Sequence, residues 1–475
     1  MIKDIAMKQL TIYILLIICT GATESCKKDL NALPSNAKVE GNVIVDQKSA
    51  QIALNGAYYQ AAGVSIYGSI PSTHFENTHE NAGAFMSGYL SSSFDDGLGD
   101  NAAQYDGPNF VLLMWANFYQ VVNAANGVIK GLEELPADKM PDSARARISG
   151  EAHFLRAYGH FNLLMYYSQF FDTTSQYGVM LRKDFVTTSN IVQARNTVKE
   201  SYDFILADID TAIANAPLSN DPSYATTWAA RALKARLLIN RGGPGDFAQV
   251  VNLTKDVITN GGYVLEPNLK DIFFEKGLKS REVILGMMPE PNQIIKQDDY
   301  INYPEWNAAQ QMADLLQTDP RADWVAGMVA SPYYGDVTLC VTKYQAEQLG
   351  EICYAFRLSE MYLLEAEAMV RNGGALGDAK DLLKTVMGHA GVTDFSDVDN
   401  AASADDLLIE IHKEVVKNLY CEDGAEWFSL LRFTFDQVKT MRPTIADKAQ
   451  YVMPIPKTEL DKNGSIKQNP GYPGI

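Results

Sequence analysis

The chain has 475 residues, of which 47% are hydrophobic, and it carries a formal net charge of −18 at pH 7. Such an acidic surface argues against binding to nucleic acid and against attraction to anionic membrane surfaces. The length is sufficient for two or three ordinary domains, or for one large unit built from repeats.

The first segment of the chain is typical of an exported protein. Lys8 precedes an almost wholly apolar run from Leu10 to Cys19, and Gly21 and Ala22 interrupt it. The run is too short to span a bilayer, which requires about twenty apolar residues. A charged start, a short apolar middle and a small-residue end together indicate a secretory signal.

Cys26 follows this run and is followed by two lysines. We therefore expect residues 1–25 to be a lipoprotein signal peptide, Cys26 to carry the lipid and residues 26–45 to form a tether. Two or more acyl chains on one residue anchor a protein stably where a single chain does not. The alternative is an ordinary secreted protein in which Cys26 stands by chance.

Residues 141–171 predict a long buried helix. Two neighbouring apolar stripes run along it at helical spacing, and such a helix is buried over most of its surface. The stripes are Ile148, Ala152, Leu155 and Gly159, and Phe154, Tyr158, Phe161 and Met165. Residues 112–136 predict an antiparallel partner, which the small side chains of Ala152 and Gly159 would allow to approach closely.

Further helices are predicted in pairs along the rest of the chain. Residues 196–216 and 223–241 form one candidate pair, residues 246–260 one more helix, and residues 356–374 and 375–391 another pair, with Gly373 as a C-terminal cap. Paired helices with small residues at their crossings indicate tetratricopeptide-like repeats. We expect an all-α fold, with a tetratricopeptide-like helical repeat scaffold in a single domain over residues 46–475.

Two regions interrupt the helical pattern. Residues 61–110 and 262–350 are rich in Gly, Pro, Ser, Asn and aromatic residues, with only short strand-like runs such as EVILGMM. Loops carried by a rigid scaffold are where binding sites usually lie. We therefore expect a loop-rich insertion region that binds the ligand.

Aromatic side chains gather in the second of these regions. Sugars offer flat C–H faces that stack on aromatic rings, so the candidate ligand-binding residues are Tyr300, Tyr303, Trp306, Trp324, Tyr333 and Tyr334, with Tyr89 from the first region. These rings lack clean helical periodicity. The alternative for each ring is that it packs the interior of a loop.

Other constellations do not indicate catalysis, a metal or a cofactor. The segment HFENTHE contains His74, Glu76, His79 and Glu80 but not the H-E-x-x-H spacing of a helical zinc site, which favours a polar loop. Asp95, Asp96 and Asp100 lack the pattern of an EF-hand. The chain contains no Walker A motif, no G-x-S-x-G and no dinucleotide fingerprint. A bridge between Cys340 and Cys353 stays possible.

Several segments, taken in order, resemble the SusD/RagB family of outer-membrane nutrient-binding lipoproteins. CKKDLNALP is similar to the family's lipidated start, and SAQIALNGAYYQ to its first helix. The resemblance continues through EAHFLRAYGHFNLLMYY, TTWAARALKARLLINRGG and RLSEMYLLEAEAMVRNGG, and closes with YVMPIPKTELDKNGSIKQNPGY. It covers essentially the whole chain.

This resemblance implies a lipid-anchored protein on the outer face of the outer membrane. Such a protein captures oligosaccharides for a SusC-like TonB-dependent transporter and contacts the membrane only through its lipid. The family binds and does not catalyse. The same architecture binding peptides or other nutrients is the first alternative, and a glycoside hydrolase is the second.

One region departs from the family pattern. Members often carry an E-R-R-x-E-L helix followed by E-G-x-R and D-L-x-R. In this chain Val415 and Val416 stand where arginines are expected, Glu426 replaces another arginine, and Ser429 replaces an aspartate. The changes remove or invert an ion-pair network, so the packing of this region is an open question. The apolar face of the segment is kept, which favours an unchanged fold.

Overall fold

The structure is a computed structural model that describes residues 43–63, 78–92, 94–289 and 291–474. The predicted signal peptide, Cys26 and the tether up to residue 42 lie outside the described residues, as do His74 and Glu76.

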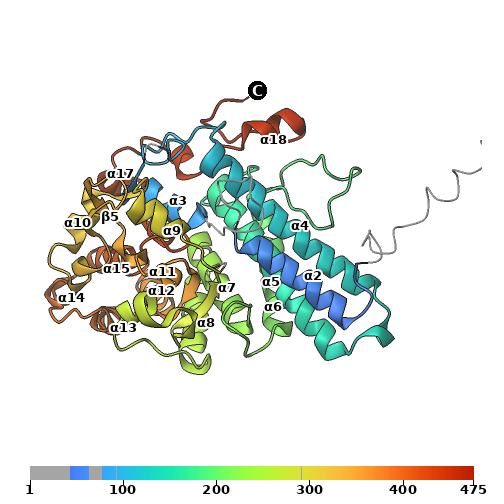
Figure 1. The fold of residues 1–475 in the computed structure, drawn as a ribbon, viewed down its shortest axis with the longest axis horizontal. Helices are drawn as coiled ribbons and strands as arrows, with labels where there is room; N and C mark the ends of the chain where they lie inside the picture. Colours follow the sequence, from blue (N-terminus) through green and yellow to red (C-terminus); the bar gives the residue numbers. More distant parts are fainter. Residues whose placement is uncertain (1–42, 64–77, 93, 290, 475) are drawn as a thin grey trace, which may run out of the picture.

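Helices build most of the described chain, which confirms the predicted all-α class. Figure 1 shows α2, α4, α5 and α6 side by side at one end of the molecule, in blue to green, with α7 and α8 following towards the other end. Their bounds are Gln47–Ala61 for α2, Leu113–Glu134 for α4, Asp142–Tyr167 for α5, Val198–Asn215 for α6, Thr227–Arg241 for α7 and Asp246–Asn260 for α8.

Helix α5 lies in the interior, as its two apolar stripes predict. It packs against α2, α4 and α6. A Cβ atom on Gly159 would lie 2.8 Å from Cγ2 of Val122 and 3.0 Å from the carbonyl oxygen of Phe118, both on α4. The absence of a side chain at Gly159 therefore permits the close approach of α4 that the sequence predicted.

The other end of the molecule carries a second set of helices. Helix α12 packs against α8, α13 and α15, and Gly373, just beyond its end, adopts a left-handed φ of +76°. That conformation suits glycine, as predicted for the C-terminal cap. The bounds are Leu358–Arg371 for α12, Leu376–His389 for α13, Ser396–Asn400 for α14, Ala404–Asn418 for α15, Ala425–Leu431 for α16 and Phe435–Met441 for α17. Helix α18, Lys457–Lys462, lies apart from this set, next to α4 (Figure 1), where Nε1 of Trp115 donates to Glu459 at 3.4 Å.

The regions predicted as loop-rich contain the strands of two small antiparallel sheets, apart from β6, which lies just beyond the second region. One has the strand order β1-β3-β5-β4, and the other pairs β2 with β6. The bounds are Leu90–Ser91 for β1, Val283–Met287 for β2, Asn307–Ala308 for β3, Gly327–Ala330 for β4, Val337–Cys340 for β5 and Cys353–Arg357 for β6. Strand β2 is the run EVILGMM that the sequence predicted as strand-like.

Short helices fill the space between these strands. The first region contains α3 and a π-helical turn, η1; the second contains several single turns around the four-stranded sheet (Figure 1). The bounds are Thr78–Ser87 for α3, Pro108–Leu112 for η1, Ile272–Lys276 for η3, Ile295–Gln297 for α9, Asp298–Asn302 for η5, Gln310–Leu316 for α10, Pro320–Asp323 for η6, Thr342–Tyr344 for η7 and Glu347–Gly350 for α11.

Buried ion pairs hold the region whose packing the sequence left open. Glu414 of α15 accepts hydrogen bonds from Arg321, at 2.6 and 2.7 Å, and Glu422 accepts from Arg357 at 2.7 Å. Val415 and Val416, where the family pattern has arginines, are buried apolar side chains. Arginines of η6 and β6 thus supply the positive charges that pair with the buried acids Glu414 and Glu422 of this region.

Cys340, Cys353 and Cys421 are free, buried thiols, so the possible bridge between Cys340 and Cys353 is absent. None of the described helices is both long and apolar enough to cross a membrane.

Candidate functional site

Six of the seven aromatic side chains predicted to bind ligand fall into two groups in the structure, and the seventh, Tyr89, is half-buried apart from both. Tyr333 and Tyr334 are 67% and 59% exposed, and Tyr303 is half-buried beside them. Tyr300, Trp306 and Trp324 are only 1%, 3% and 6% exposed. A ring without a solvent-facing surface cannot stack on a sugar, so these last three are removed from the candidate set.

The buried rings form the aromatic interior beneath the sheet. Trp306 lies edge-on to Phe85 of α3 and Tyr300 of η5, with ring centroids 6.3 and 5.9 Å away. Tyr300 also stacks on Tyr344 and donates its hydroxyl to Oδ1 of Asn81. These contacts join the two loop-rich regions and give the rings a structural role.

Trp324 has ring contacts of the same kind, whereas Tyr89 is half-buried against the hydrophobic core and bonds through its backbone. Trp324 packs against Phe273 and Phe274, with ring centroids 5.8 and 6.1 Å away. Tyr89 lies at the start of β1, and its carbonyl oxygen accepts hydrogen bonds from the backbone N–H of Ala309 and the hydroxyl of Tyr420. Burial raises the pKa of Tyr89 to about 12.

The remaining three rings form one cluster, which we call the tyrosine platform: Tyr303, Tyr333 and Tyr334. The ring centroid of Tyr303 lies 4.5 Å from that of Tyr333 and 6.0 Å from that of Tyr334, and the last two are 5.1 Å apart. The interplanar angles are 49°, 81° and 87°, so the exposed faces point in different directions. Each phenolic hydroxyl can donate and accept a hydrogen bond.

Ser331 fixes the turn that carries two of these rings. Its buried hydroxyl donates to the carbonyl oxygen of Asn302 at 2.6 Å and accepts from the backbone N–H groups of Tyr333 and Tyr334, at 3.2 and 2.9 Å. The turn closes with Gly335 at a φ of +78°, which favours glycine. Asn302 immediately precedes Tyr303, so this one hydroxyl links the backbone segments that carry all three rings.

The hairpin of β4 and β5 adds an exposed apolar face. Ala330 is the cross-strand partner of Val337, and Met328 that of Leu339, so the four side chains share a face. Met328 and Val337 are largely exposed. The sequence analysis did not predict Met328, Val337 or Ser331 as part of the site. The alternation of exposed and half-buried residues along β4 and the turn sequence S-P-Y-Y-G-D are the signals that could have indicated them.

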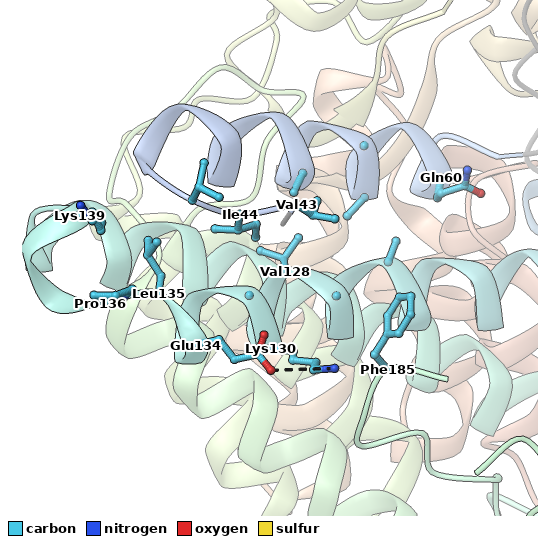
Figure 2. A pocket seen from close by; sticks show the side chains of 17 residues that line it. Val43, Ile44, Gln60, Val128, Lys130, Glu134, Leu135, Pro136, Lys139 and Phe185 are labelled. Atoms are coloured by element: carbon cyan, nitrogen blue, oxygen red, sulfur yellow. Dashed lines mark ion pairs between the residues drawn. The ribbon is translucent and has the colours of Figure 1, made fainter. Parts of the chain in front are cut away.

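A concave surface lies between α2 and α4, apart from the tyrosine platform (Figure 2). This helical groove has a volume of about 750 Å³ and is mostly apolar. Figure 2 shows Val43 and Ile44 between the two helices, with Phe185 at one end and Pro136 at the other. Few of its lining groups could bond to sugar hydroxyls, so the tyrosine platform suits a glycan better.

The predicted polar loop at HFENTHE is corrected by the structure where it is described. His79 and Glu80 lie buried in α3, because each has a charged partner inside the protein. Nε2 of His79 is 2.8 Å from Oδ1 of Asp423, and a carboxylate oxygen of Glu80 is 3.1 Å from Nζ of Lys296.

Two of the aspartates of the first loop-rich region, Asp95 and Asp96, bond to the backbone. The carboxylate of Asp95 accepts from the N–H groups of Gly97 and Gly99, and that of Asp96 from Phe110. Over the residues that the structure describes, no group of three or more His, Cys, Asp or Glu side chains is arranged to hold a metal ion.

Two family models match the chain. Residues 30–239 match the model described as "Starch-binding associating with outer membrane", and residues 337–444 match the model of the SusD family. A SusD-like protein of Bacteroides ovatus is 26% identical over 185 residues, which are 37% of this chain and 32% of that protein. The match thus spans about a third of the length of that relative.

Solved structures resemble this fold along most of its length. A SusD superfamily protein of Bacteroides thetaiotaomicron has a TM-score of 0.73 and 22% identity, covering 90% of this chain and 100% of that one. A SusD superfamily protein of Parabacteroides distasonis has a TM-score of 0.74 and 17% identity, covering 90% and 99%. A laminarin-binding SusD-like protein has a TM-score of 0.70 and 21% identity, covering 90% and 100%.

Proposed function

The chain belongs to the SusD family, and from this we propose that it is a surface lipoprotein that captures oligosaccharides and passes them to a SusC-like TonB-dependent transporter. The ligand is gripped by the tyrosine platform. Cys26 carries the lipid after removal of residues 1–25, and residues 46–475 form one domain with its ligand-binding insertions at about 61–110 and 262–350.

The observation that carries this proposal is the exposed, pre-arranged set of rings at Tyr303, Tyr333 and Tyr334. Large aromatic side chains are normally buried, and a cluster left in solvent marks a binding surface. Rings stack on the C–H faces of sugars, while the three hydroxyls can bond to sugar hydroxyls. The laminarin-binding relative of the same fold supports a glycan as the ligand.

We propose binding without hydrolysis. Glycoside hydrolysis requires two carboxyl groups at a defined separation on either side of the scissile bond. The acids beside the platform include Glu305, which is half-buried, and Asp336, which is exposed to water. Purified protein is expected to release no reducing sugar from any polysaccharide that it binds.

Calorimetry against a panel of oligosaccharides tests the proposal. We expect the chain with Cys26→Ser, which prevents acylation, to bind at least one glycan, and Tyr333→Ala with Tyr334→Ala to lose that binding. Tyr59→Ala removes a partly exposed ring from α2 and serves as the matched control. Binding of peptides without glycans would favour the alternative of a peptide-capture protein, and a flat response to the whole glycan panel would end the sugar proposal.

A further inference from the structure

The positive charges of the chain segment that carries the tyrosine platform are all used inside the protein. Residues 291–346, all of them described, contain three basic side chains: Lys296, Arg321 and Lys343. These side chains are 6%, 0% and 1% exposed. The segment around the platform therefore offers no basic group to solvent.

Each of the three is also paired with a carboxylate. Nζ of Lys296 lies 3.1 Å from Oε2 of Glu80, and Lys343 donates to Oε1 of Glu422. Arg321 forms two bonds to Asp319, at 2.7 and 2.8 Å, and two more to Glu414. Moving such a group towards a ligand would leave a buried carboxylate unpaired, which costs several kcal/mol.

The charges that do reach solvent in this region are negative. The two segments that carry the platform and its sheet, residues 298–308 and 327–341, contain acids and no Lys, Arg or His. Asp336 is exposed in the same turn as Tyr333 and Tyr334, while Asp298 and Glu305 flank Tyr303 and are half-buried. The protein as a whole adds to this field with its net charge of −18.

A glycan that carries carboxylate or sulfate groups is repelled by these negative charges. Sites for such anions use Arg or Lys to form charge-assisted hydrogen bonds. Here an anion would lose its hydration next to carboxylates, and like charges brought together at an interface cost up to several kcal/mol. Stacking of C–H faces on the rings is independent of charge, so neutral sugars avoid this cost.

We propose that the tyrosine platform selects uncharged glycans and rejects glycans that carry carboxylate or sulfate groups. This inference rests on the proposed function, because it names the class of ligand for the same site. The selection acts through repulsion by Asp336 and the neighbouring acids and through the commitment of Lys296, Arg321 and Lys343 to internal ion pairs.

The test compares neutral and anionic derivatives of one backbone. The probes are hydroxyethyl and carboxymethyl derivatives, with similar degrees of substitution, of whichever neutral glucan the chain binds in calorimetry. We expect the carboxymethyl derivative to bind about tenfold more weakly or worse at about 20 mM salt. The gap should narrow at about 500 mM salt, because exposed charges are then screened.

Introduced cations provide the second part of the test. Met328→Lys and Val337→Lys place a lysine at exposed positions of the hairpin that carries Tyr333 and Tyr334. We expect both variants to regain affinity for the carboxymethyl derivative at low salt. Leu218→Lys makes the same change in charge at an exposed position before α7 and should leave the discrimination unchanged.

Two results would overturn the inference: one rejects only the charge selection, and the other also rejects the proposed function. If the carboxymethyl derivative binds the unmodified protein as tightly as the hydroxyethyl derivative, the charge selection fails while glycan capture at the platform stands. If neither derivative nor any parent glycan binds, the proposed function itself fails, and the inference fails with it.

Discussion

The rings of Tyr303 and Tyr333 lie with their centroids 4.5 Å apart, although one follows η5 and the other sits in the turn between β4 and β5. The contact joins two segments through Ser331, whose hydroxyl bonds to the residue before Tyr303 and to the backbone of Tyr333. Because the rings are held before any ligand arrives, little side-chain entropy remains to be lost on binding. The platform rings should therefore contribute to ligand binding, the turn at Ser331 to their positioning, and the buried rings to stability.

Removing a platform ring should affect binding and leave folding intact. Tyr333→Ala and Tyr334→Ala each delete a largely exposed side chain, so the free energy of unfolding should change by no more than about 0.5 kcal/mol. Affinity for the bound glycan should fall by about tenfold to a hundredfold, as for other central aromatic contacts. Calorimetry and urea unfolding on the same preparations measure both quantities, and an unchanged affinity in both variants would contradict the assignment.

Trp306→Ala should show the opposite pattern. Trp306 is buried between the rings of Phe85 and Phe110, so its truncation leaves a cavity in the interior and costs about 3–5 kcal/mol of unfolding free energy. The thermal midpoint should fall clearly. Glycan affinity, measured at a temperature where the variant is folded, should stay within a few-fold of the parent value, and selective loss of affinity without loss of stability would return Trp306 to the binding surface.

The turn can be tested through its single hydroxyl. Ser331→Ala removes three hydrogen bonds that hold the tyrosine platform, at a cost of about 0.5–1.5 kcal/mol for a typical bond. We expect a several-fold loss of affinity from faster dissociation, because the rings then have to be ordered on binding. Ser331→Thr keeps the hydroxyl and should restore most of the affinity, so surface plasmon resonance of both variants distinguishes positioning from simple destabilisation.

The scaffold could be predicted from the sequence more completely than the site. Periodic apolar stripes define α5, and Gly159 marks its crossing with α4, because both features depend only on neighbours along one helix. The region of clustered rings was also visible. What the sequence could not resolve is which rings face water, because Trp306 is buried by Phe85 and Phe110, which come from distant parts of the chain.

The ion pairs of α15 could not be predicted from the sequence for the same reason, since their partners come from distant parts of the chain. The missing arginines at 415 and 416 indicate a lost network, yet Glu414 of α15 is paired with Arg321 of η6, which lies in the second loop-rich region, about ninety residues earlier in the chain. Only the folded chain shows that an arginine of a distant segment supplies the charge that pairs with Glu414.

Glu426, which stands where the family pattern has an arginine, should make the stability of the protein depend on pH. It is fully buried in α16, and neither carboxylate oxygen has a hydrogen-bond partner among the described residues. Burial raises the pKa of Glu426 to about 8, although the nearby backbone groups of Glu426 and Cys421 and the positive charge of Lys343 lower it; the negative charge of Glu422 raises it further. The neighbouring groups that sense its charge are Tyr89, Tyr166, Tyr420 and Cys421.

The unfolding free energy should fall as the pH rises, because the pKa of Glu426 is raised in the folded state. In the unfolded chain a glutamate titrates near about 4.3, so between that pH and about 8 the unfolded state releases a proton that the folded state retains. This group therefore stabilises the fold fully only below about pH 4, and the unfolding free energy should fall by up to about 1.4 kcal/mol per pH unit as the pH rises towards 8. Glu426→Gln stays neutral and should flatten that slope, whereas Glu347→Gln, at an exposed position of α11, should leave it as it is. Urea unfolding at about pH 5.5, 7 and 8.5 measures the three slopes, and parallel curves for the parent and Glu426→Gln would show that Glu426 is ionised in the folded protein.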